Sequence, residues 1–310
     1  MKRIQTVKGG IDPSKLGFTY THEHLVCYPP SVAMKEDPDF ELPHKDKALA
    51  EIKLFEAAGG GCLVEGTAID YGRSPEAYLD IANNTSVNIV FTSGFNKGRF
   101  YPDWVKKASA DELADLLTDE IRNGVAESDI KPGILKCGSW YNVITKDEEK
   151  VTRAVARAHL KTGAPIWIHT EAGTMGLEQL DILEDEGVTL DKNVCVGHSD
   201  RNADLWYHKK MASRGAYVGY DGPSKVKYYP DSVRVELIKG MFEAGYGEKL
   251  LVSGDMGRKS YLKSYGGGPG FEFIIKKFVN RLLDEGMNQE EIDQIWVKNP
   301  AEYLAFELKN

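Results

Sequence analysis

The sequence predicts a (β/α)8 barrel, also called a TIM barrel, in which eight parallel strands form a ring and helices cover its outside. Short apolar runs alternate with amphipathic stretches of helical length, and the runs are apolar enough to be covered on both faces. The length of 310 residues suits one such barrel. Because no low-complexity linker or shift in composition interrupts the chain, residues 1–310 are expected to form a single domain.

The expected strands are rich in β-branched residues and are separated by turn or helix signals. They cover residues 18–25, 62–66, 88–93, 133–138, 165–170, 193–198, 216–220 and 249–254.

Helical patterns lie between these strands, and several end in glycine, as helices often do. They cover residues 46–58, 110–123, 146–162, 177–186, 204–213 and 232–244. A last helical segment, 289–307, is expected to pack on the outside of the barrel.

The composition excludes several classes of protein. The net charge of −8 is spread along the chain, which argues against a protein that binds nucleic acid through phosphate contacts. The basic residues near the N-terminus are not followed by an apolar segment, and no window is long enough to span a membrane. We therefore expect a cytoplasmic protein with no membrane partner. The cysteines are predicted to be buried, reduced thiols: Cys27, Cys62, Cys137 and Cys195.

The first expected strand carries the pair His22 and His24. Alternate residues of a strand project from the same face, so both imidazoles would point one way and Glu23 the other. A His-x-His pair also occurs on ordinary exposed strands, so the pair alone only suggests a metal site.

Chemistry in such barrels lies at the C-terminal ends of the strands. Four of the seven histidines occupy those ends, together with one lysine and one aspartate. The candidate metal ligands are His22, His24, Lys136, His169, His198 and Asp255. The other histidines, His44, His159 and His208, are expected to be surface or packing residues.

Lys136 needs a separate explanation, because an ammonium group would be repelled by metal ions. Burial and nearby cations lower a lysine pKa, and the neutral amine can react with carbon dioxide to form an anionic carbamate. So modified, Lys136 could bridge two divalent ions, with His22, His24 and Asp255 on one, His169 and His198 on the other, and a hydroxide between them. These ligands suit zinc, manganese, cobalt or iron, and zinc is the default expectation.

With these residues in place, the chain resembles the phosphotriesterase family of the amidohydrolase superfamily. The resemblance covers nearly the whole chain and rests on Thr21-His22-Glu23-His24, Leu135-Lys136, residues 151–158 with 162–165, Ile168-His169-Thr170, Gly197-His198-Ser199-Asp200, Ser253-Gly254-Asp255 and Asn299-Pro300-Ala301. It implies a barrel with a binuclear metal centre bridged by carboxylated Lys136, and hydrolysis of an ester, lactone or phosphoester. Asp255 is the expected catalytic residue, which takes a proton from the attacking water and passes it to the leaving alkoxide.

The substrate is predicted from the loops after strands seven and eight, 221–229 and 256–268, which are rich in basic residues and glycine. Barrels frequently bind phosphate there. The expected phosphate-binding residues are Lys225, Lys227, Arg258, Lys259 and, from an earlier loop, Tyr101, with Lys97 and Arg99 as further candidates.

This basic pattern resembles the family's lactonases for phosphorylated sugar lactones. Lactonases that act on acyl chains tend to carry arginine soon after the strand-seven aspartate, whereas here Gly222 follows Asp221. We therefore expect hydrolysis of a small anionic substrate, a phosphorylated pentono-1,4-lactone. Whether the chain forms a homodimer is left open.

Other functions fit parts of the pattern. A phosphodiesterase, phosphotriesterase or carboxylesterase could use the same metal centre, and a non-catalytic binding barrel could keep the fold. A dinucleotide-binding enzyme is set aside, because the glycine clusters 59–61 and 266–268 do not follow the G-x-G-x-x-G pattern between strand and helix.

Overall fold

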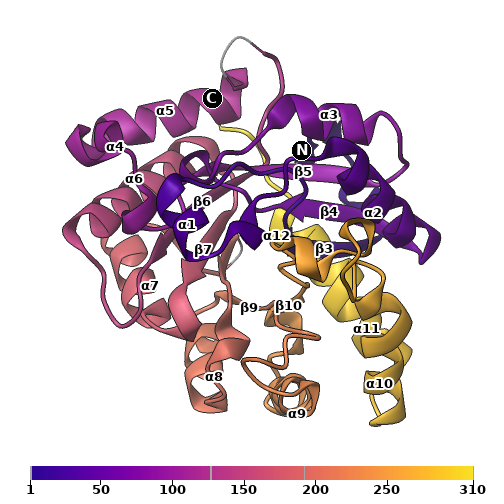
Figure 1. Ribbon diagram of the computed structural model, residues 1–310. Coiled ribbons are helices and arrows are strands. Elements are labelled where there is room, and N and C mark those ends of the chain that lie inside the picture. Colours follow the sequence, from indigo (N-terminus) through magenta and orange to yellow (C-terminus); the bar gives the residue numbers. More distant parts are fainter. Residues whose placement is uncertain (1, 126–127, 192, 310) are drawn as a thin grey trace.

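The computed structural model describes residues 2–125, 128–191 and 193–309. Within them, eight parallel strands follow one another around a ring in chain order, and helices surround the ring (Figure 1). The strands are β3 (Phe18–Glu23), β4 (Gly60–Glu65), β5 (Asn88–Gly94), β6 (Ile134–Ser139), β7 (Ile166–Thr170), β8 (Val194–Val196), β9 (Tyr217–Tyr220) and β10 (Leu250–Val252). The predicted barrel is confirmed, although several strands are shorter than the apolar runs.

The first and last strands of the ring meet just beyond β10. The Asp255 backbone amide donates to the His22 carbonyl at 3.1 Å. The buried Glu23 carboxylate accepts from the amides of Gly254 at 2.6 Å and Met256 at 2.8 Å. These bonds join β3 to the segment after β10 at the end where the predicted site lies.

Helices follow the strands. They include α2 (Lys45–Ala57), α5 (Ala110–Asn123), α6 (Lys146–Thr162), α7 (Gly176–Asp185), α8 (Leu205–Ser213) and α9 (Asp231–Glu243), each within two residues of its predicted range. Capping boxes fix two of the starts: Ser109 with Glu112 at α5, and Thr145 with Glu148 at α6. At the end of α6, Gly163 adopts a positive φ of 80°, which glycine tolerates without steric cost.

Several short elements were not predicted. They are β1 (Ile4–Thr6), β2 (Gly9–Ile11), α1 (Ser31–Glu36), α3 (Pro75–Ala82), α4 (Asp103–Lys107) and α10 (Val279–Asp284). Most of these span fewer than two helical turns or only three strand residues, so their sequence shows too few repeats of either period to be recognised.

The prediction that 289–307 packs on the outside is wrong for its C-terminal part. The segment forms α11 (Gln289–Asp293), a π-helical turn at Gln294–Lys298 and α12 (Asn299–Leu304). The Asn299 side chain donates to the carbonyls of Gly247 and Leu250 at 2.9 and 2.7 Å, which holds the start of α12 against the N-terminal end of β10.

As a result, the end of α12 closes the floor of the barrel. Tyr303 and Leu304 belong to the apolar cluster inside the ring, with Trp167 and Leu251. The Tyr303 hydroxyl donates to the Ile166 carbonyl at 2.9 Å, at the start of β7. A second, larger apolar cluster lies between the strands and the surrounding helices. Among the described helices, none is long and apolar enough to cross a membrane.

The closed floor leads to a first prediction. Replacing Leu304, which is 0% exposed, with alanine should lower the free energy of unfolding by about 2–5 kcal/mol, because it leaves a cavity inside the ring. Leu308→Ala is the matched control, since Leu308 is 44% exposed and should cost less than about 0.5 kcal/mol. Urea unfolding of both variants measures the difference, and equal losses would contradict the placement of α12.

Candidate active site

His22, in β3, and His24, just after it, face the aspartate that follows β10. His22 Nε2 lies 3.6 Å and His24 Nε2 3.5 Å from the same oxygen, Asp255 Oδ1. Strand alternation accounts for this arrangement, because it places both imidazoles on one side and Glu23 on the other. His24 Nδ1 is held by the Thr67 hydroxyl at 2.7 Å, so Nε2 faces Asp255.

The second pair of histidines comes from the ends of β7 and β8. His198 Nε2 lies 2.9 Å from His169 Nδ1, and the other ring nitrogen of His198 lies 2.8 Å from an Asp221 carboxylate oxygen. His198 lies outside β8, which ends at Val196 although the strand was predicted to reach residue 198, and has a φ of +59°. This uncommon backbone conformation turns the side chain toward His169.

Burial keeps the imidazoles of His22, His169 and His198 neutral. It lowers the pKa of His169 to about 4 and those of His22 and His198 well below the usual histidine value. A neutral imidazole has a free lone pair, as a metal ligand requires.

Lys136 lies at the base of the same cavity and is 1% exposed. Its ammonium group donates to the Gly66 carbonyl at 2.6 Å. Burial lowers its pKa to about 8, although nearby carboxylates such as Asp255 oppose the shift. A substantial fraction of the amine is therefore neutral at slightly alkaline pH.

The six predicted metal ligands all line one cavity of about 220 Å³. Within the described residues, two groups place their donor atoms within 4.8 Å of one another: His22, His24 and Asp255, and His22, His198 and Asp221. Neutral imidazoles beside ionised carboxylates are the donors that zinc and similar divalent ions prefer, so the residues present fit a metal centre.

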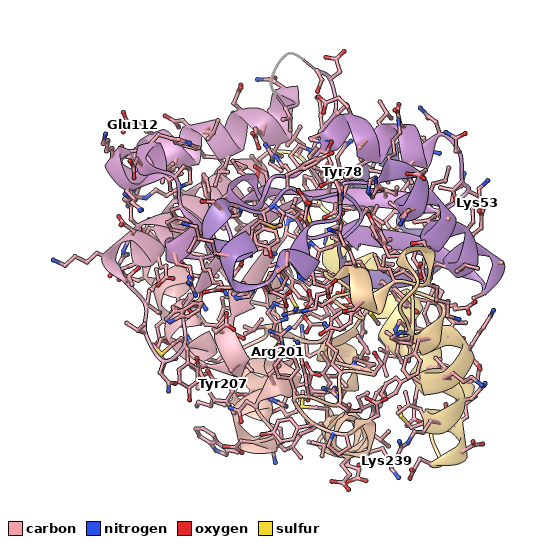
Figure 2. All side chains as sticks on the ribbon, viewed as in Figure 1. Lys53, Tyr78, Glu112, Arg201, Tyr207 and Lys239 are labelled. Carbon is pink, nitrogen blue, oxygen red and sulfur yellow. The ribbon has the colours of Figure 1, made fainter. Side chains whose placement is uncertain are left out.

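Arg201 and Asp221 belong to the site but were not among the predicted residues. Arg201 donates to Asp255 Oδ2 at 2.7 Å and lies 3.7 Å from Asp221. In Figure 2, Arg201 lies near the middle of the molecule, whereas Lys53, Glu112 and Lys239 lie at its edge. Asp221 could have been found, because it directly follows the seventh strand. Arg201 could not, since it reaches the site only through the turn after His198.

Asp255 is held ionised. Burial alone would raise its pKa, but Lys225, His24 and Arg201 together lower it well below the ordinary aspartate value. Lys225 donates to Asp255 Oδ2 at 2.8 Å and to its carbonyl at 2.6 Å. Because both cations bind Oδ2, Oδ1 is left to face the histidines.

The predicted phosphate-binding residues are only partly brought together. Lys225, Lys227 and Arg258 line the cavity, and Lys97 joins them from the loop after β5. Lys225 is already bonded to Asp255, and Arg258 is paired with Asp37. Lys227 contacts no carboxylate among the described residues, and its ammonium lies 5.0 Å from the Tyr228 ring centre and 5.5 Å from that of Tyr261.

Tyr101 and Lys259 do not line the cavity. Tyr101 is 3% exposed and packs edge-on against Phe95, with 5.9 Å between ring centres, because its turn directs the ring into the core. Lys259 points away and lies 3.7 Å from Glu41. Arg99 is likewise outside the lining and pairs with Glu36.

The remaining histidines have structural contacts. His44 is exposed, and His159 bonds the Ala164 carbonyl at 2.7 Å. His208 is buried between the Tyr220 hydroxyl and the Ser199 carbonyl.

Imidazoles that converge on a carboxylate at the open end of a (β/α)8 barrel define the class of this protein as a barrel hydrolase. The chain belongs to the phosphotriesterase family, whose sequence model matches residues 2–304.

Solved structures and curated relatives agree with this assignment. A lactonase from Listeria monocytogenes is 40% identical, with a TM-score of 0.95 and coverage of 98% of this chain and 99% of that one. The phosphotriesterase homology protein of Escherichia coli, solved with phosphate in its active site, is 34% identical, with a TM-score of 0.90 and coverage of 95% and 100%. A phospho-furanose lactonase of Mycoplasmopsis synoviae is 33% identical over 99% of this chain and 93% of its own.

A buried ion pair between Arg234 and Asp200 lies next to the site. Arg234 Nε donates to Asp200 Oδ2 at 2.7 Å, and both side chains are 0% exposed. The other Asp200 oxygen accepts from the Asp221 amide at 3.1 Å. This pair therefore positions the backbone that carries Asp221.

Removing one partner should be costly. Arg234→Met leaves the Asp200 charge buried and unpaired, so the free energy of unfolding should fall by about 3–5 kcal/mol. Arg281→Met is the matched control, because its pair with Glu285 is 42% and 46% exposed and is worth about 0.5 kcal/mol or less. Chemical denaturation of both variants measures the difference. A fall of less than about 1 kcal/mol in the free energy of unfolding of Arg234→Met would contradict the role of Arg234 in pairing the buried Asp200 charge.

Proposed function

We propose that this hydrolase opens a phosphorylated sugar lactone, a pentono-1,4-lactone carrying a 5-phosphate. The observation that carries the proposal is Lys227, a cation at the cavity wall with no carboxylate partner among the described residues. An anionic group entering the cavity would supply that partner. The names of two similar proteins, a lactonase and a phospho-furanose lactonase, support a lactone, and phosphate in the active site of a third supports an anion there.

The proposed metal centre uses the residues named above. His22, His24 and Asp255 would hold one divalent ion, His169 and His198 a second, and Lys136 would bridge them as a carbamate. Zinc is the first expectation, with manganese, cobalt and iron as alternatives. When bound, such ions activate water near neutral pH and polarise the carbonyl under attack.

The protein's own residues account for the remaining steps. The neutral Lys136 amine attacks carbon dioxide, forming a nitrogen–carbon bond and releasing one proton. Asp255 accepts the proton of the attacking water and donates it to the ring oxygen that leaves as the alcohol. Arg201 and Lys225 keep Asp255 in place through Oδ2.

The reaction is tested by acid release from pentono-1,4-lactones with and without the 5-phosphate, using protein loaded with zinc or manganese in bicarbonate. We expect hydrolysis of the phosphorylated lactone, weak turnover of its unphosphorylated counterpart, and loss of activity after chelation of the metal. Hydrolysis of a simple phosphodiester, with neither lactone turned over, would favour the phosphoesterase alternative.

Lys227→Met tests the phosphate contact. Losing a charged hydrogen bond of about 1.5–3 kcal/mol should raise KM for the phosphorylated lactone about 10- to 100-fold. KM for the unphosphorylated lactone should not change. Lys239→Met on α9, outside the cavity, is the control. An unchanged KM in Lys227→Met would remove this residue from phosphate binding.

A further inference from the structure

A charged pair lies in the cavity wall beside His169 and has no part in the mechanism above. Lys97 Nζ donates to Glu171 Oε2 at 2.5 Å, and the same oxygen lies 3.4 Å from His169 Nε2. Lys97 is 8% exposed, and the Glu171 side chain is 27% exposed. Removing both charges from bulk water costs free energy, so stability alone gives little reason for such a pair.

The pair sits against aromatic surface. The Lys97 ammonium lies 4.5 Å from the ring centre of Trp140 and 5.0 Å from that of Phe100, and both rings line the cavity. Asn96 also lines it. This wall therefore combines aromatic side chains with a hydrogen-bond donor and a carboxylate acceptor.

Those groups match the chemistry of a sugar ring. Its hydroxyl groups can donate to a carboxylate and accept from an ammonium. Polar groups that converge beside aromatic side chains fix the orientation of a small ligand.

The two ends of the cavity are separated by the barrel topology. Lys97 follows β5 and Glu171 follows β7, whereas Lys227 follows β9. In a ring ordered β3 to β10, the loops after β5 and β9 lie on opposite sides of the mouth. A ligand whose phosphate reaches Lys227 therefore presents its other end to Lys97 and Glu171.

We propose that Lys97 and Glu171 form a hydroxyl subsite that selects lactones with a hydroxyl group on C2, the carbon next to the carbonyl. This inference rests on the proposed function, because the carbonyl must lie near His169 for C2 to face the pair. A site built to bond a hydroxyl group rejects an analogue that lacks it, since its buried polar groups are then left unpaired.

The test compares the best substrate among the four D-pentono-1,4-lactone 5-phosphates with its 2-deoxy analogue. In the unchanged enzyme, kcat/KM should be about 100-fold or more lower for the 2-deoxy lactone. In Glu171→Gln and in Lys97→Met the ratio should fall to less than about tenfold, chiefly through loss of activity on the hydroxylated lactone. Glu178→Gln makes the same chemical change at an exposed position outside the cavity and should keep the full ratio.

The ratio separates recognition from damage to the metal centre. Loss of metal would lower activity on both lactones equally, and metal content measured for each variant checks this directly. If the unchanged enzyme hydrolyses both lactones with similar kcat/KM, the subsite is refuted while the proposed function stands.

If no lactone is hydrolysed, the proposed function is refuted. The subsite is then tested by measuring ligand binding with calorimetry. The probes are then the ring-opened pentonic acid 5-phosphates and their 2-deoxy counterparts. Tighter binding of a hydroxylated acid that is lost in Glu171→Gln would support the subsite, and equal binding would refute it.

Discussion

The buried carboxylate of Glu23 is the contact on which both barrel and site depend. It accepts from the amides on either side of Asp255, and it lies between His22 and His24 in the sequence. One side chain thus joins the first strand of the ring to the segment after the last, across 231 residues for the Gly254 bond. Together with the bond from the Asp255 amide to the His22 carbonyl at 3.1 Å, this closure brings the two imidazoles to Asp255.

The Asp255 carboxylate, which this closure places in the cavity, is paired with two cations. The cavity gathers neutral imidazoles, and the nearby cations Arg201 and Lys225 occupy one carboxylate oxygen. An ionised carboxylate in such a buried place needs paired donors, because an isolated charge would be too costly to bury. Because these donors bind Oδ2, they leave Oδ1 free. The same contacts therefore stabilise the buried charge and orient Asp255 in the site.

The basic loops also have two separate roles. Lys225 was predicted to hold phosphate, yet it supports Asp255, while Lys227, two residues later, lines the cavity with its ammonium 5.5 Å from the Tyr261 ring centre. Lys97 and Glu171 add a polar wall on the other side of the mouth. In this arrangement the metal-ligand candidates lie between one wall suited to an anion and another suited to hydroxyl groups.

The sequence by itself determined the barrel and the six candidate ligands, because strand periodicity and the position of polar residues at strand ends are local properties. It also identified the basic loops, but not what each cation touches. Only the tertiary structure placed Tyr101 in the core, Arg201 against Asp255, Glu171 beside Lys97, and α12 in the barrel floor. These positions depend on turns after the strands and on contacts between residues far apart in the chain, which no local pattern of residues records.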